Sequence, residues 1–139
     1  MPLKYGYNWA ELAAPAIRQF TEPGKAAAGD WKTRRTRIEV LFGKTGAVNF
    51  PPEIEHIVHH AEAEDGHQVA IHHVPQRVRP STGKCPATVH VYGGGYFSCS
   101  AASMVAAMGM YVSKTRVRML SIEYRLAPEN PFPVPLEDC

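Results

Sequence analysis

The sequence predicts an α/β fold in which two parallel strands are joined by a helix. Between residues 87 and 124 a β-favouring stretch, a run of glycines, an apolar helical stretch and a second β-favouring stretch follow one another. A helical crossover between two strands makes them parallel, with a right-handed connection. The 139 residues, 45% hydrophobic and 20% charged, have the composition of a globular domain with a single core.

Composition also indicates which partners are not expected and in which cellular compartment the protein is expected. The 15 basic and 13 acidic residues are mixed along the chain, so no large positive field for nucleic acid or anionic lipid is expected. Cys85, Cys99 and Cys139 are widely spaced and form no CxxC pair, which argues against a disulfide framework and a zinc knuckle. We expect a reducing, cytoplasmic compartment, because neither a signal peptide nor a membrane span is visible.

Residues 1–50 are expected to form a helical cap and linker region. Asn8 and Glu11 have the spacing of a capping box, which predicts a helix over residues 9–20. The basic run at residues 32–37 is interpreted as a solvated surface in a linker, with an anion site as the weaker alternative.

Two β-favouring stretches, residues 54–61 and 67–74, flank an Asp-Gly turn signal and predict an antiparallel hairpin. Imidazole is the commonest metal ligand, so the histidines gathered here raise the alternative of a zinc site. Alternation places His56 and His60 on one face and His59 on the other, without a carboxylate or cysteine at ligand spacing. The favoured interpretation is therefore surface or edge-strand histidines for the set His56, His59, His60, His67, His72 and His73.

The next elements are a strand over residues 87–92, a helix over residues 101–112 with Ser100 as its cap, and a strand over residues 117–124. The helix is apolar on nearly every face, so it should be covered on more than one side. Its methionines are expected in the core, namely Met104, Met108 and Met110.

Three glycines, Gly93, Gly94 and Gly95, follow the first of these strands. Without Cβ atoms, such a loop turns sharply and brings backbone N–H groups against an anion. The anion would be a phosphate or the oxyanion that develops when an ester carbonyl is attacked. Neither phosphate-loop motif is present, which favours the oxyanion, and a purely structural turn is a further alternative.

Two segments carry a family resemblance: PATVHVYGGGY at residues 86–96 and SIEYRLAPENPFP at residues 121–133. Together they resemble the hormone-sensitive-lipase family of α/β-hydrolases. The resemblance implies a serine esterase or lipase without cofactor or metal, with residues 51–139 as the N-terminal half of the hydrolase domain and an incomplete sheet. It also implies that the glycines supply oxyanion N–H groups, with Gly94 and Gly95 as the principal donors.

The sequence departs from the family at three positions. Tyr92 replaces the motif's leading histidine, with His90 two positions earlier, Glu123 stands where the family usually has aspartate, and Asn130 where it often has histidine. The resemblance implies that Tyr92, Arg125 and Glu129 support the loops rather than take part in chemistry.

No GxSxG motif occurs, and in this fold the serine, acid and histidine follow the oxyanion loop in that order. Whether these residues form an enzyme by themselves is thus left open. We expect a truncated carboxylic-ester hydrolase whose complete form acts on small or medium acyl esters, with a resemblance to esterase-like proteins of fungal secondary-metabolite and toxin pathways. The alternatives are a degenerate gene product or a non-catalytic protein that docks a partner along an open strand edge at residues 117–124.

Overall fold

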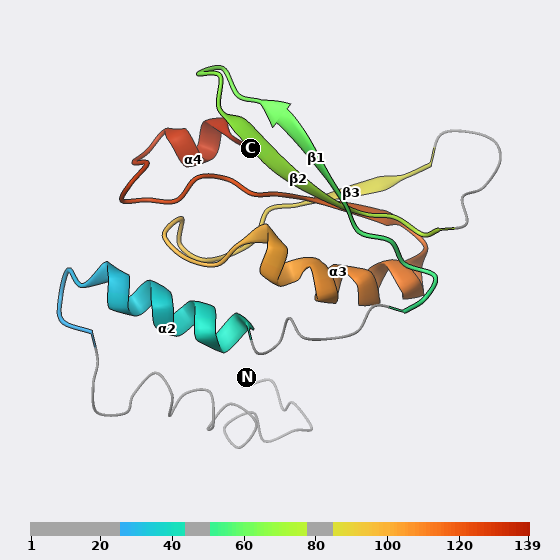
Figure 1. The fold of residues 1–139 in the computed structure, drawn as a ribbon, viewed down its shortest axis with the longest axis horizontal. Helices are drawn as coiled ribbons and strands as arrows, with labels where there is room; N and C mark the ends of the chain where they lie inside the picture. The colour runs from blue at the N-terminus through green and yellow to red at the C-terminus, as the bar shows by residue number, and fades with distance from the viewer. Residues whose placement is uncertain (1–25, 44–50, 78–84) are drawn as a thin grey trace, which may run out of the picture.

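The computed structural model describes residues 26–43, 51–77 and 85–139, so the helix expected over residues 9–20 lies outside the described residues. The elements are arranged around one sheet (Figure 1). In chain order they are α2 (Trp31–Gly43), β1 (Ile57–Glu62), β2 (Gln68–Val74), β3 (Ala87–His90), α3 (Ala101–Thr115), β4 (Arg118–Ile122) and α4 (Val134–Glu137).

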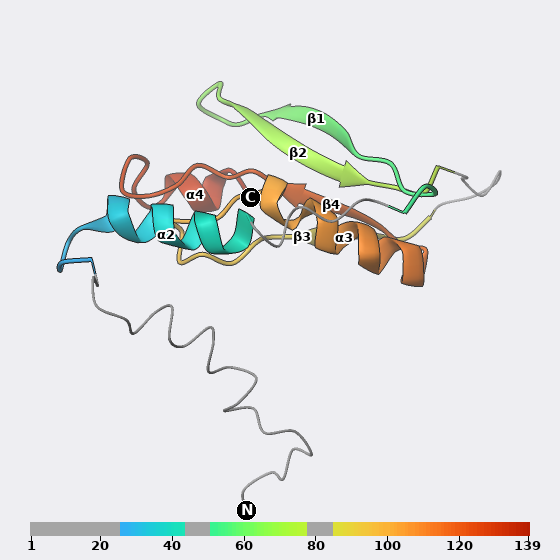
Figure 2. The ribbon, with the colours of Figure 1, turned by 60° about the horizontal axis from the view of Figure 1, so that its bottom comes forward.

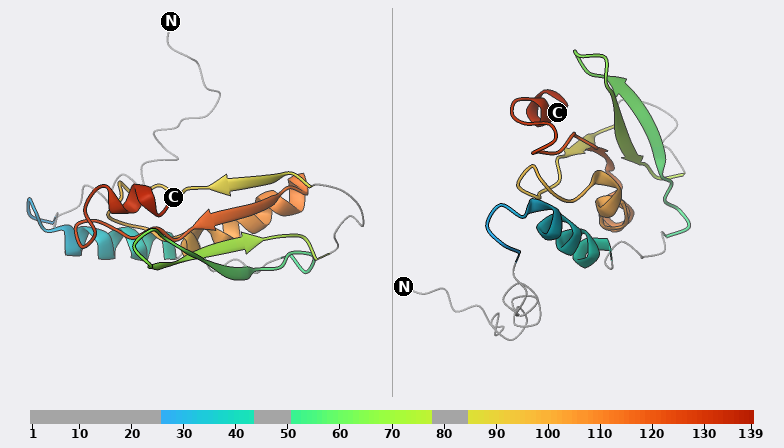
Figure 3. Two further views of the ribbon diagram at one scale, coloured as in Figure 1. Left: turned by 90° about the horizontal axis from the view of Figure 1, so that it is seen from above. Right: turned by 60° about the vertical axis from the view of Figure 1, so that its left-hand side comes forward.

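The four described strands form a mixed sheet in the order β1-β2-β4-β3 (Figure 3). β1 and β2 pair antiparallel from Ile57 opposite His73 to Glu62 opposite Gln68. β3 and β4 pair parallel, and α3 forms the crossover between them. The structure therefore confirms the α/β class, the hairpin and the parallel βαβ unit.

The expected open edge at residues 117–124 is wrong. β4 lies inside the sheet, with Ile122 opposite Ile71 of β2 and Leu120 opposite Val89 of β3. The hairpin docks its second strand antiparallel on β4 and so occupies the edge that a purely parallel sheet would leave open. Within the described strands the edge on that side is β3, where Val89 is 62% exposed.

Helix α3 begins where the sequence predicts. The Ser100 hydroxyl accepts a hydrogen bond from the Ser103 N–H at 3.1 Å, which satisfies a free donor of the first turn. The helix ends at Thr115, beyond the expected residue 112. The core between α3 and the sheet consists of Ile54, Val74, Val105, Met108 and Val112, with Met104 packed against it.

The methionine and basic-run expectations are each partly wrong. Met108 is buried, but Met110 is 46% exposed because the described structure covers one face of α3 and leaves the other to solvent. Residues 32–37 form part of α2 rather than a linker. Figure 2 shows α2 near the start of α3, where Ile38 packs against a second core cluster, made of Tyr92, Cys99, Ala101 and Tyr124.

Two of the histidines are buried, contrary to the expectation of surface positions. His72 and His73 lie on β2, which is flanked by β1 and β4 and so is not an edge strand. Each lies close to another histidine, one just before β1 and one within it. His56 Nε2 lies 2.9 Å from His72 Nδ1, and His59 Nε2 lies 3.3 Å from His73 Nδ1. Residues 26–43, 51–77 and 85–139 contain no group of three or more His, Cys, Asp or Glu side chains placed to bind a metal ion.

We expect acidification below about pH 6.5, the usual histidine pKa, to destabilise the protein. Burial lowers the pKa of His72 in the folded state, so the unfolded state binds this proton more readily and stability falls as pH decreases from about 6.5 toward the lowered pKa. His72→Gln should flatten this pH dependence in urea denaturation. His60→Gln, on exposed β1, is the control, and an equal flattening there would contradict the assignment.

Candidate active site

The glycine loop that follows β3 has a backbone conformation that favours glycine. Gly94 has a φ of +155° and Gly95 a φ of +62°. A Cβ atom on Gly94 would fall on the carbonyl oxygen of Ser98, well inside van der Waals contact. Glycine at position 94 is therefore required both by conformation and by space.

In the loop, the carbonyl group of Gly94 is hydrogen-bonded, whereas among the described residues the N–H groups of Gly94 and Gly95 are not. The Gly94 carbonyl accepts three hydrogen bonds, from the N–H groups of Phe97 and Ser98 at 3.3 and 3.2 Å and from the Ser98 hydroxyl at 2.9 Å. The N–H groups of Gly94 and Gly95 make no hydrogen bond within the described residues. Fixing the carbonyl while leaving the N–H groups available is what an anion-binding loop requires.

Two tyrosines hold the strand ends from which the loop departs. The Tyr124 hydroxyl donates to the Tyr92 carbonyl at 2.8 Å, and the Tyr92 hydroxyl donates to the Tyr124 carbonyl at 3.3 Å. Their rings stack with centroids 4.2 Å apart. Burial, together with the neighbouring Glu123 carboxylate, raises the pKa of Tyr92 far above its usual value, so its hydroxyl stays a donor.

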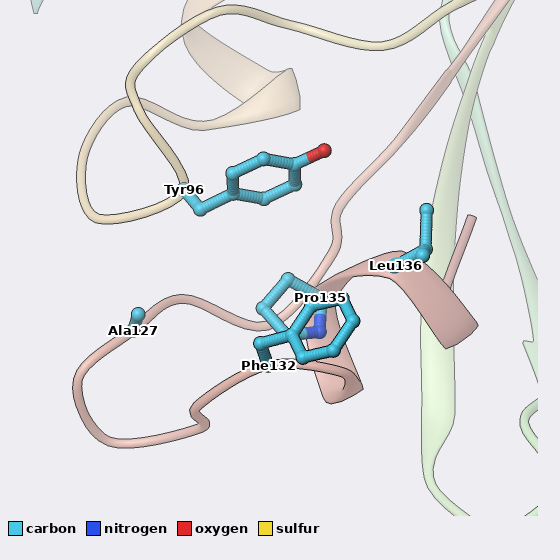
Figure 4. A pocket seen from close by; sticks show the side chains of 5 residues that line it. All are labelled: Tyr96, Ala127, Phe132, Pro135 and Leu136. Atoms are coloured by element: carbon cyan, nitrogen blue, oxygen red, sulfur yellow. The ribbon is translucent and has the colours of Figure 1, made fainter.

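An apolar pocket of about 220 Å³ lies beside the loop. Figure 4 shows the Tyr96 ring, one residue beyond the glycines, on one side and the Phe132 and Pro135 rings opposite it. Its described walls also include Ala127 and Leu136. The pocket could take an apolar group of a molecule whose polar centre faces the glycine N–H groups.

Residues 88–139, which include the loop and both strand ends, match the profile of a family described as having the alpha/beta hydrolase fold. The chain has the α/β-hydrolase fold, and its closing segment is similar to hormone-sensitive lipases. It is 39% identical over 51 residues to hormone-sensitive lipase of Bos taurus, covering 37% of this chain and 7% of that protein. It is also 39% identical over 64 residues to 2-hydroxyisoflavanone dehydratase of Glycyrrhiza echinata, covering 45% and 20%.

Solved structures extend this likeness over most of the chain. A bacterial heroin esterase has a TM-score of 0.77 and 27% identity, covering 93% of this chain and 39% of that one. An esterase of Pyrobaculum calidifontis has a TM-score of 0.65 and 26% identity, covering 89% and 39%. The chain thus spans about two fifths of these solved α/β-hydrolases and at most a fifth of the two curated relatives.

The hydrolase fold places Arg35 of α2 against two loops of the site, the glycine loop after β3 and the loop that follows β4. Its guanidinium donates to the carbonyl of Phe97 at 2.6 Å and to that of Ala127 at 2.7 Å. It also forms a two-pronged pair with Glu129, both distances 2.7 Å, which lowers the pKa of that carboxyl. Sequence reasoning missed this role, because a basic run by itself carries no sign of a partner 94 residues away.

Replacing Arg35 with methionine is expected to release α2 from the two loops. The variant keeps an apolar stem but loses all four donated hydrogen bonds, and hydrogen exchange of α2 amides should rise severalfold. Arg37→Met is the matched control, because Arg37 is exposed on the same helix and its guanidinium makes no hydrogen bond within the described residues. Equal exchange in the two variants would show that Arg35 does not fasten the helix.

The other predicted support residue, Arg125, lies at a different junction. It pairs with Asp138 beside α4, through Nη2 and Oδ1 at 2.7 Å, and with Asp65 of the hairpin turn at 2.6 Å. Neither carboxylate was predicted from the sequence to pair with Arg125. In the described parts of the chain none of the helices has the length and apolar character needed to cross a bilayer.

Proposed function

We propose that this chain carries the oxyanion-binding part of a carboxylic-ester hydrolase. The observation that carries the proposal is the pair of unengaged N–H groups at Gly94 and Gly95, beside a Gly94 carbonyl that Ser98 and Phe97 hold in place. The similarity to a lipase and to solved esterases supports this chemistry over a phosphate site.

In the proposed reaction, attack on the ester carbonyl turns its oxygen into an oxyanion, which accepts hydrogen bonds from the two glycine N–H groups. The serine nucleophile with its acid and base would come from outside these 139 residues, because no GxSxG motif occurs among them. A third donor N–H would come from the residue after that serine. Tyr92, Arg125 and Glu129 would hold the loops without touching the substrate.

The proposed substrate is an ester with a small or medium acyl group. The pocket of about 220 Å³ beside Tyr96 is apolar, which suits the acyl or alcohol group of an ester. A place in fungal secondary-metabolite or toxin biosynthesis is part of this proposal.

The test is hydrolysis of p-nitrophenyl esters of increasing acyl length by the full-length protein that contains this chain. We expect turnover of the short and medium esters that declines for long ones, and loss of turnover on treatment with an organophosphonate that labels serine. Absence of turnover across the series in a folded protein would refute the proposal.

A non-catalytic binding role is the second candidate, and one observation favours it. Within the described strands β3 has a free edge, with Val89 and Val91 at least half exposed beside it. A strand edge with apolar neighbours is a template for a further strand. A folded full-length protein that lacks esterase activity but forms a stable complex through β3 would favour this role, and one with neither property would point to a degenerate product.

A further inference from the structure

A half-buried carboxylate joins three parts of the hydrolase fold at the base of the oxyanion loop. Glu123 follows β4, and its Oε1 accepts a hydrogen bond from the Tyr92 hydroxyl at 3.4 Å. Its Oε2 accepts from the Ala102 N–H in the first turn of α3 at 3.2 Å. Glu123 therefore links the strand that leads into the loop with the helix that follows it.

Glu123 is also connected to the protein surface through two histidines. The Nε2 atom of His72 lies 3.6 Å from Glu123 Oε2. On the other side of the ring, His72 Nδ1 lies 2.9 Å from His56 Nε2, and the two rings stack with an angle of 13° between their planes. His72 is buried, His56 is exposed and the Glu123 side chain is 30% exposed, so a row of titratable groups links the carboxylate to a second point on the surface.

The charges around the carboxylate set how it responds to protons. The titratable groups that face it are Tyr92, from the end of β3, and His72, from β2, while α3 presents N–H groups and His56 faces His72. No lysine or arginine pairs with Glu123 among the described residues. Burial raises the pKa of Glu123 and lowers the pKa values of His72 and His56. Because no permanent cation lies beside the carboxylate among the described side chains, only its hydrogen bonds oppose this rise in the Glu123 pKa.

We propose that Glu123 is a positioning residue for the oxyanion loop, and that the His56–His72 pair weakens its hold on the loop when the network takes up a proton. This inference rests on the proposed function of the loop. An ionised carboxylate is the stronger acceptor for the Tyr92 hydroxyl and suits the positive N-terminal end of α3. A proton taken up by the coupled Glu123–His72 pair, at either group, reduces the negative charge that both donors see.

The consequence reaches the glycines through one strand end. Tyr92 precedes Gly93 directly, and its ring and carbonyl are also held by Tyr124. When the Tyr92 hydroxyl loses its charged acceptor, the start of the loop loses one of its fixed points. A displacement of the oxyanion donors on the scale of an ångström reduces turnover by up to about a hundredfold.

The experiment follows the Gly94 and Gly95 amide resonances of the full-length protein by NMR as pH is lowered, together with the His72 ring. We expect the glycine amides to shift with the midpoint of the His72 ring titration. In Glu123→Gln the glycine shift should disappear while the ring still titrates, and kcat should fall roughly tenfold to hundredfold with KM nearly unchanged. Glycine amides that do not move with pH, or that move equally in Glu123→Gln, would overturn the proposal.

His72→Gln gives a second test that does not require Glu123→Gln to fold, and it should also abolish the pH-dependent glycine shift. His59→Gln is the matched control: it removes the neighbouring histidine pair of the same hairpin and should leave the glycine titration intact. Because the NMR readouts do not use ester cleavage, a titrating loop in a protein without esterase activity would refute the proposed function and leave the network standing.

Discussion

On the proposed function of the glycine loop, replacing Gly94 with alanine is expected to lower kcat/KM for ester hydrolysis by roughly a hundredfold to a thousandfold, the loss that follows removal of one oxyanion donor. The added methyl group would collide with the Ser98 carbonyl oxygen, and the backbone holds a φ of +155° that alanine rarely adopts. The loop must therefore shift, which moves the N–H groups of Gly94 and Gly95 away from the reacting oxygen. Steady-state kinetics of the full-length protein on a short-chain ester measures the effect.

Gly66→Ala is the matched control for this substitution. Gly66 also has a positive φ, of +84°, but it lies in the hairpin turn with open space around its Cα. Its replacement introduces similar backbone strain without disturbing the loop, so it should cost some stability and leave kcat/KM near the parent value. Equal losses of activity in the two variants would mean that general destabilisation, and not the loop, explains the Gly94 result.

The elements that local pattern specifies were predictable from the sequence. The glycine run, the Ser100 cap and the β-branched residues on either side together define a strand, a loop, a helix and a strand, and these residues act on neighbours a few positions away. The Asp65-Gly66 turn fixed the hairpin in the same way, with Gly66 at positive φ.

What the sequence did not predict depends on contacts between distant residues. The docking of β2 on β4, which buries His72 and His73, depends on pairing between strands about 50 residues apart in sequence. The alternation of apolar residues within a strand does not show which strand it pairs with. The pairs of Arg35 with Glu129 and of Arg125 with Asp65 span 94 and 60 residues. The candidate glycines were therefore named from a motif, whereas Arg35, Ser98 and Asp138, and the contacts of Glu123, became visible only in three dimensions.

Replacing Arg125 with methionine is expected to be strongly destabilising. The Asp138 side chain is fully buried and accepts hydrogen bonds from the backbone N–H of Arg125 at 2.8 Å and from its guanidinium at 2.7 to 3.2 Å. The Asp65 side chain, in contrast, is 53% exposed. Removing the guanidinium leaves a buried carboxylate without its cation, whereas an exposed pair contributes little. In urea denaturation the loss for Arg125→Met should thus be several times that for Asp65→Asn.

The stability that the Arg125–Asp138 pair contributes should depend on pH. Hydrogen bonds from Arg125 lower the pKa of Asp138 below its usual value, so the stabilisation is present above about pH 4 and is lost as the pH falls through the lowered pKa. Arg125→Met should remove this acid-sensitive component. The double variant Arg125→Met with Asp138→Leu should recover much of the lost stability, because it is the unpaired buried charge and not the missing arginine that destabilises the single variant. A double variant no more stable than Arg125→Met would show instead that the loss comes from Arg125's remaining contacts with the hairpin.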